Sequence, residues 1–197
     1  MTRLFSLLAL AALLLAPEAR AQAPLAPGTP VPLADQAFAT PGGPSQTLAE
    51  ASREGGLVVV TWSAACPWTE RYAARLAEVR AGAAANGIGF VLVASNDASR
   101  SPGDTPEALA ASAAAIGAPI LLDADAALAE ALGATQTPEA FFFDGGLRYS
   151  GAIDDSPAEA ARVTIPYLQQ ALDQRLASQA VEIERTTPFG CTIKRAR

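Results

Sequence analysis

Cys66 is the residue in this sequence best placed for reactive sulfur chemistry. It follows the apolar run Leu57–Trp62 and stands immediately before Pro67, where a helical pattern begins, with Arg71 one turn further on. A helix N-terminus presents unpaired backbone N–H groups and partial positive charge, and both favour a thiolate over a thiol. A Cys at this position can be a redox nucleophile, and its position alone does not decide between this role and the alternatives. The alternatives are a small buried hydrophobe or half of a structural disulfide.

The composition excludes several other kinds of site. The 197 residues include two Cys and no His. Without His there is no Ser-His-Asp triad, no Cys-His dyad and no His-ligated zinc, and two Cys cannot form an all-Cys zinc site. We therefore expect no metal and no cofactor. A formal net charge of −6 argues against binding to nucleic acid or to an anionic membrane.

Residues 1–21 have the pattern of a secretory signal peptide. A basic start, Met1–Arg3, precedes the apolar run Leu4–Ala16, and Ala19 and Ala21 offer small residues for cleavage. The run is too short to span a bilayer, although an uncleaved anchor is the alternative. We expect a periplasmic or secreted protein with no membrane span after cleavage, in a compartment where a disulfide persists.

The remaining sequence predicts a layered α/β domain. An extended Pro-rich segment, 22–46, precedes the domain at 47–178, and a non-helical tail follows at 179–197. The predicted strands cover 57–62, 88–94, 119–122, 140–143 and 147–152. The predicted helices cover 67–85, 106–115, 126–132 and 157–178, the last interrupted by Pro166. Alternating strands and helices indicate a central sheet with helices over it. A short hairpin is expected between 31–33 and 37–40.

Residues 59–69 resemble the active-site strand, loop and helix of thioredoxins. Cys66 falls on the first Cys of their Cys-x-x-Cys motif. Thr137 and Pro138, just before a predicted strand, are similar to the thioredoxin cis-proline turn. The resemblance implies a thioredoxin-like fold, an α/β structure with a central mixed sheet flanked by helices. It also implies that the Thr137 backbone, set by Pro138, positions an extended peptide or thiol substrate, and that Trp68 lines the substrate face.

Three further segments are similar to an uncharacterised peroxiredoxin-like branch of the redoxins, the alkyl hydroperoxide reductase and thiol-specific antioxidant group. They are Ser95–Asp97, Gly151–Asp155 and the tail segment Pro188–Lys194. The branch implies an exported thiol–disulfide oxidoreductase or thiol-dependent antioxidant with a single active-site Cys. Its partners would be a thiol or disulfide protein, a small thiol or a peroxide.

The sequence also departs from these families around Cys66. Thr69 replaces the second Cys of the thioredoxin motif, and Val60 stands where thioredoxins carry a buried carboxylate. Ser63 fits the hydroxyl position of the peroxiredoxin motif, but Val59 replaces its Pro. What the resemblance implies is that the Thr69 or Ser63 hydroxyl, with helix N–H groups, stabilises the Cys66 thiolate.

Cys191 is the remaining sulfur, 125 residues after Cys66 in the tail. About 15 tail residues can span up to roughly 50 Å, so Cys191 can reach the Cys66 helix. We expect the two to pair when oxidised, with Cys191 as the resolving thiol. If the disulfide is permanent, the protein is instead a non-catalytic binding module of the cell envelope.

Two polar pairs are weaker candidates. Asp154 and Asp155 follow a strand and are expected to form a solvated turn and helix cap, with a metal pair as the alternative. Asn96 and Asp97 follow another strand, at the sheet edge where α/β proteins place ligands, although a loop cap is the simpler role.

Overall fold

The computed structural model describes residues 23–196, so the predicted signal peptide at 1–21 lies outside the described residues. Its strands are β1 (Phe38–Thr40), β2 (Gly43–Gln46), β3 (Leu57–Thr61), β4 (Gly89–Ala94), β5 (Ile120–Leu122), β6 (Gln136–Thr137), β7 (Glu139–Phe143), β8 (Leu147–Gly151) and β9 (Cys191–Thr192). Its helices are α1 (Leu48–Ala51), α2 (Pro67–Ala85), α3 (Pro106–Ile116), α4 (Ala127–Leu132), the 3₁₀ helix η1 (Ala160–Arg162) and α5 (Tyr167–Leu176).

A mixed sheet forms the centre of the protein, in the order β2-β1-β5-β4-β3-β7-β8. The strands β3, β4 and β5 run parallel, and the strands on either side of them pair antiparallel. All residues of β3 and β4 are buried, as expected for continuous apolar runs covered on both faces. The predicted strands at 140–143 and 147–152 correspond to β7 and β8, which pair antiparallel as a hairpin across a turn at 144–146.

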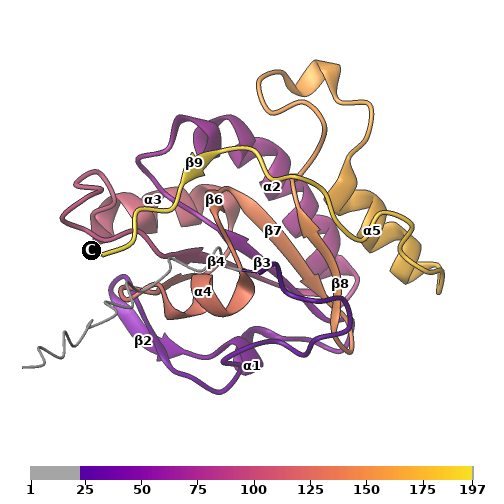
Figure 1. The fold of residues 1–197 in the computed structure, drawn as a ribbon, viewed down its shortest axis with the longest axis horizontal. Coiled ribbons are helices and arrows are strands. Elements are labelled where there is room, and N and C mark those ends of the chain that lie inside the picture. The colour runs from indigo at the N-terminus through magenta and orange to yellow at the C-terminus, as the bar shows by residue number, and fades with distance from the viewer. Residues whose placement is uncertain (1–22, 197) are drawn as a thin grey trace, which may run out of the picture.

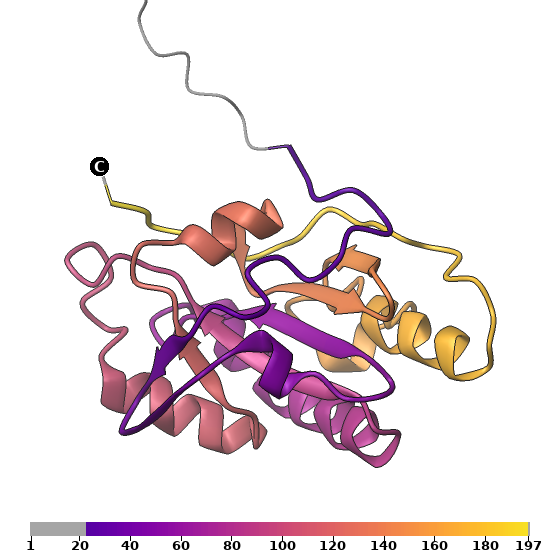
Figure 2. The same cartoon turned by 90° about the horizontal axis from the view of Figure 1, so that it is seen from below.

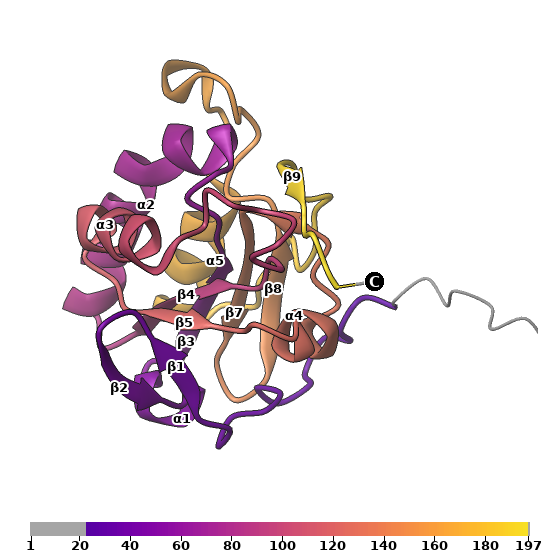
Figure 3. The same cartoon turned by 90° about the vertical axis from the view of Figure 1, so that its left-hand side faces the viewer.

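Two apolar clusters lie on opposite faces of the sheet. Val58 and Val60 pack in one cluster with residues of α2, α3 and α5. Leu57 and Val59 point to the other face and pack with residues of α1 and α4. Figure 2 shows α4 on one side of the sheet and α2, α3 and α5 on the other, and Figure 3 shows the same layers from the side. The alternation along β3 therefore follows the period of a strand.

The C-terminal tail returns across the molecule after α5. Figure 1 shows it as the yellow trace that carries β9 to the neighbourhood of β6. There β9 pairs antiparallel with β6, outside the main sheet. The tail is non-helical, as predicted, and it closes over the end of the sheet at which β3 leads into α2.

Two of the predicted elements are wrong. The helix expected over 157–178 is in fact the short η1 followed by α5, which begins at Tyr167. Pro166 lacks a backbone N–H and fixes its φ, so it ends up before the helix and not inside it. The expected partner of the 37–40 strand was 31–33, but β1 pairs with β2 across a turn at 41–42.

Within residues 23–196, no helix combines the length and the apolar character needed to cross a bilayer.

Candidate redox site at the helix N-terminus

Cys66 and Cys191 form a disulfide, with their Cα atoms 6.1 Å apart. Cys66 is the N-cap residue of α2, and Pro67 occupies the first turn, as the sequence predicted. The loop between β3 and α2 buries Cys66, which is 3% exposed, whereas Cys191 in β9 is half-buried. The disulfide therefore joins the N-terminus of α2 to a short strand of the tail.

The Thr137–Pro138 peptide bond, which is cis, faces this disulfide. The Cys66 Sγ lies 3.2 Å from the Thr137 carbonyl oxygen. In the β6–β9 pairing Thr137 stands opposite Cys191, and the Thr137 hydroxyl donates to the Cys191 carbonyl at 3.3 Å. Three of the residues singled out from the sequence, Cys66, Thr137 and Cys191, are thus brought together at one point.

The two hydroxyls expected near the thiolate bind other groups in this oxidised state. The Thr69 Oγ1 is 2.6 Å from the carbonyl oxygens of both Ser63 and Cys66. The Ser63 hydroxyl donates to the carboxylate of Asp104 at 2.9 Å. Both residues therefore fix the loop that carries Cys66, and their action on a free thiolate stays a prediction.

Asp104 is a residue of this site that the sequence did not indicate. It is 8% exposed, and besides the Ser63 hydroxyl its carboxylate accepts the Ala65 backbone N–H at 3.0 Å and the Asn96 amide at 2.7 Å. The Asn96 Oδ1 in turn accepts the Lys194 backbone N–H at 2.7 Å. One buried carboxylate thus links the Cys66 loop to the tail that carries Cys191. In sequence it sits in a polar loop with nothing to distinguish it.

Glu139 is a second carboxylate that the sequence did not indicate, directly after the cis-proline. It is 7% exposed, and it accepts the backbone N–H groups of Thr135 at 2.9 Å and Gln136 at 3.2 Å. Burial raises the pKa of Glu139, although these two hydrogen bonds oppose the change. Its signal in the sequence is a single charge at the start of an apolar strand.

Trp68 lies on the first turn of α2 and contacts the tail. Its ring packs edge-to-face on Phe189, with centroids 4.7 Å apart. The Arg71 guanidinium lies 5.5 Å from the Trp68 ring centroid. Trp68 is therefore half-buried and packs on the chain's own tail, and its expected role in lining a substrate face stays a prediction.

The predicted solvated turn at Asp154 is wrong. Asp154 is buried and forms an ion pair with Arg75 of α2, and it accepts the Tyr72 hydroxyl at 3.2 Å. Asp155 instead is exposed, and hydrogen bonds from Thr164 lower its pKa. The described residues hold no group of three or more potential metal ligands from His, Cys, Asp and Glu.

Asn96 and Asp97 also have different roles from each other. Asn96 holds the tail through Lys194, whereas Asp97 accepts the backbone N–H and hydroxyl of Ser99, as a loop cap does. The backbone N–H of Asp97 also donates to the Lys194 carbonyl at 2.7 Å.

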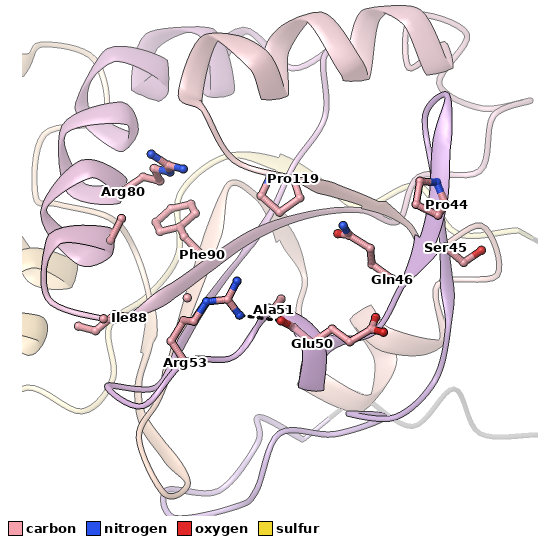
Figure 4. Close-up of a pocket in the computed structure, with 13 residues that line it drawn as sticks. Pro44, Ser45, Gln46, Glu50, Ala51, Arg53, Arg80, Ile88, Phe90 and Pro119 are labelled. Carbon is pink, nitrogen blue, oxygen red and sulfur yellow. Dashed lines mark hydrogen bonds between the residues drawn. The ribbon is translucent and has the colours of Figure 1, made fainter.

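A cavity of about 630 Å³ lies away from the disulfide, between α2 and the hairpin of β1 and β2. Figure 4 shows Arg53, Arg80 and Gln46 around it, with Phe90 and Pro119 as apolar walls. It opens where β4 begins, whereas Cys66 lies beyond the end at which β3 stops. The cavity is therefore at the end of the parallel strands opposite the Cys66–Cys191 disulfide.

Comparison with known proteins gives structural relatives. No protein-family model matches the chain, and no curated protein matches it. A hypothetical protein from Sinorhizobium meliloti is 33% identical, with a TM-score of 0.78 over 87% of this chain and 96% of that chain. An uncharacterised conserved protein from Geobacillus kaustophilus is 28% identical, with a TM-score of 0.74 over 84% of this chain and 93% of that chain.

A third solved structure shares the fold. A putative thiol:disulfide interchange protein DsbE from Chlorobium tepidum is 17% identical, with a TM-score of 0.55 over 78% of this chain and 97% of that chain. A thioredoxin-like protein solved in its oxidised form is 20% identical, with a TM-score of 0.56 over 81% of this chain and 99% of that chain. The fold is therefore α/β and thioredoxin-like, with a central mixed sheet flanked by helices, as the resemblance implied.

Proposed function

This chain belongs to the family of the Sinorhizobium meliloti hypothetical protein, and we propose that it is a thiol–disulfide oxidoreductase whose nucleophile is Cys66. The observation that carries the proposal is the Cys66–Cys191 disulfide at the N-terminus of α2, against the Thr137–Pro138 turn. A structural disulfide needs no helix N-terminus and no such turn, whereas thiol exchange benefits from both a stabilised thiolate and a backbone edge that receives a substrate.

The reaction begins with both thiols reduced. The Cys66 thiolate attacks one sulfur of a substrate disulfide, that S–S bond breaks, and one substrate thiolate leaves. The Cys191 thiolate then attacks the Cys66 Sγ, and the second substrate thiolate leaves as the Cys66–Cys191 disulfide forms. Two electrons pass to the substrate, and an external dithiol returns the protein to its reduced state.

The same pair of thiols would reduce a peroxide. Cys66 would attack one peroxide oxygen to give a sulfenic acid and an alcohol or water, and Cys191 would displace water to form the disulfide. This antioxidant role follows from the peroxiredoxin-like tail motif, residues 188–194. We favour disulfide substrates because the edge of β6 pairs with an extended chain, which a small peroxide does not offer.

The proposal places the protein outside the cytoplasm. A disulfide such as Cys66–Cys191 persists in an oxidising compartment, whereas in the cytosol the two thiols would be kept reduced. The signal-peptide pattern at 1–21 supports the same location, periplasmic or secreted.

One set of observations favours the alternative, a binding module with a permanent disulfide. The tail is held by β-pairing with Thr137 and by hydrogen bonds to Asn96 and Asp97, so it does not depend on the disulfide alone. In this alternative the disulfide would never open during function.

Turnover separates the two possibilities. We expect the purified protein to accelerate the reduction of insulin disulfides by dithiothreitol, and Cys66→Ser to abolish the acceleration. Reduced Cys191→Ser protein, mixed with insulin after the dithiothreitol is removed, should keep the first attack but accumulate a Cys66–substrate disulfide, visible on a non-reducing gel. Thr192→Ala, an exposed change next to Cys191, serves as the matched control and should leave the rate unchanged. Equal rates for wild type and Cys66→Ser would reject the oxidoreductase and leave the binding module.

A further inference from the structure

We propose that tail residues 189–193 are a tethered copy of the substrate, so that the substrate class is an extended peptide with the pattern aromatic–Gly–Cys–any residue–aliphatic. This inference rests on the proposed function, because it takes Cys66 to be the attacking thiol. It concerns what Cys66 attacks and what the substrate must displace.

The backbone of the tail lies in the position of a bound peptide. Cys191 stands opposite Thr137 and is bonded to Cys66, and Thr192 stands opposite Gln136. The Ile193 backbone N–H extends the pairing by donating to the Thr135 carbonyl at 3.0 Å. Chemically, the Cys66–Cys191 bond is the same as a mixed disulfide between Cys66 and an extended peptide that adds a strand to β6.

The position before the cysteine accepts only glycine. A Cβ on Gly190 would overlap the carbonyl oxygen of Thr137 and would lie 3.0 Å from the Pro138 nitrogen. Both obstacles are backbone atoms of the turn that faces Cys66, so they cannot move aside as the end of a flexible side chain can. A peptide docked in this register therefore needs Gly immediately before its Cys.

The flanking positions select side chains of two kinds. Phe189, two residues before the cysteine, is 47% exposed, and its ring packs against Trp68. Ile193, two residues after the cysteine, is 3% exposed and packs in the apolar cluster that contains Ala134. Burial of that side chain contributes binding free energy, whereas Thr192 between them is exposed and leaves its position open.

The tail also has a competitive advantage over any free peptide. Lys194 is held at both backbone groups, by the Asn96 side chain and the Asp97 N–H, each at 2.7 Å. Because the tail is covalently attached, its effective concentration at β6 is high, and it occupies the edge after the disulfide is reduced. A substrate must therefore match the pattern well enough to displace it.

The test uses Cys191→Ser protein, in which Cys66 is the only thiol. The probe is a peptide of the tail sequence 186–195 whose Cys carries a thionitrobenzoate group in a disulfide. Cys66 thiolate attacks the peptide sulfur, the S–S bond breaks, and coloured thionitrobenzoate leaves as the lower-pKa thiolate. Its release gives the rate of mixed-disulfide formation.

We expect this peptide to react at least about tenfold faster than peptides with the Gly changed to Val or the Ile changed to Ser. It should react as fast as a peptide in which the Thr directly after the Cys is changed to Ala. Adding Gly190→Val to the Cys191→Ser protein should displace its own tail and increase the rate with the unaltered peptide. Thr192→Ala in the same background is the control and should not change it. The peptide comparison in Cys191→Ser stands even if the Gly190→Val protein does not fold.

The reagent 5,5′-dithiobis(2-nitrobenzoate), which is too small to need the β6 edge, separates two failures. If Cys66 reacts with this reagent but all the peptides react at one rate, the tethered-substrate inference is wrong and the oxidoreductase stands. If Cys66 reacts with neither in the reduced, folded protein, the proposed function is wrong, and this inference falls with it.

Discussion

The two sulfur atoms of the disulfide lie in different surroundings. Cys66 caps a 19-residue helix, whose N-terminal partial charge stabilises a thiolate, whereas Cys191 sits in a two-residue strand with no helix near its sequence. In the disulfide the Cys66 Sγ lies 3.2 Å from the Thr137 carbonyl oxygen. In the reduced protein this oxygen would accept a hydrogen bond from the Cys66 thiol and so favour the thiol, against the effect of the helix. The opposing effects of the helix N-terminus and the Thr137 carbonyl determine what fraction of reduced Cys66 is thiolate.

We predict that in the reduced protein the Cys66 thiol has a lower pKa than the Cys191 thiol, because only Cys66 lies at the N-terminus of a helix. The pH dependence of alkylation by iodoacetamide measures the first in Cys191→Ser protein and the second in Cys66→Ser protein. Each variant thus serves as the other's control. A Cys66 pKa equal to that of Cys191 would remove the activation argument.

Glu139 gives the protein a pH-dependent stability. Its pKa is raised by burial in the folded state, from an ordinary value of 4.5 when unfolded. The folded state therefore binds the proton more tightly, so this contribution is fully present below about pH 4.5 and is lost as the pH rises through the folded pKa. We predict that Glu139→Gln, which keeps an acceptor for the Thr135 and Gln136 N–H groups, gains stability relative to wild type as the pH rises.

Thermal unfolding at a series of pH values measures this effect. Asp35→Asn, an exposed change remote in sequence from the turn, provides the control. A difference between Glu139→Gln and wild type that stays constant with pH would contradict the prediction.

Among single residues, the sequence predicted those whose roles depend on neighbouring segments of the chain. Cys66 and Pro138 were found because their roles depend on the strand and helix next to them in the chain. Asp104 and Glu139 were missed because their burial comes from segments that are distant in sequence. Asp104 meets Ser63, 41 residues earlier, and nothing near it in sequence marks it as buried.

At the scale of elements, α2 is joined to the loop after β8 by a buried ion pair. Arg75 pairs with Asp154, and its guanidinium also donates to the Ser156 carbonyl at 3.1 Å. We predict that Asp154→Asn lowers the free energy of unfolding by about 3 kcal/mol, because it leaves the mostly buried Arg75 charge without its counter-ion. Chemical denaturation measures it.

The neighbouring Asp155→Asn is the matched control, since Asp155 is exposed. We expect it to change the stability little. A similar loss for both variants would mean that the Arg75 ion pair is not the cause.

The sequence predicted the bounds of the strands best where the strands are buried along their whole length. Runs of β-branched and apolar residues predicted β3 and β4 nearly to their ends, because strands covered on both faces need such runs. The prediction of one helix over 157–178 was wrong because the sequence pattern cannot distinguish a Pro that starts a helix from one that interrupts it. In the structure Pro166 is the N-cap residue of α5. β9 has only two residues, so its pairing with β6 depends on the whole fold.

At the scale of the whole molecule, the disulfide closes a loop across most of the described chain. With a sequence separation of 125 between the two Cys, the chain-entropy model gives a stabilisation of about 5 kcal/mol. We predict that reduction lowers the free energy of unfolding by up to that amount while the protein stays folded, since β-pairing and hydrogen bonds also hold the tail. Urea denaturation of oxidised and reduced protein measures the difference.

The Cys66→Ser, Cys191→Ser double variant should match the reduced protein and so controls for the reductant. If oxidised and reduced protein unfold at the same urea concentration, the disulfide does not constrain the chain as described.

The reduction potential of the Cys66–Cys191 disulfide distinguishes a disulfide that opens and closes during function from a permanent one. Equilibration of the protein in glutathione or dithiothreitol redox buffers, followed by alkylation of free thiols and mass spectrometry, gives the value. A working pair is expected between about −270 and −120 mV, the range of thiol–disulfide oxidoreductases. A potential below about −300 mV, where structural disulfides lie, would contradict the account and make this a protein with a permanent disulfide.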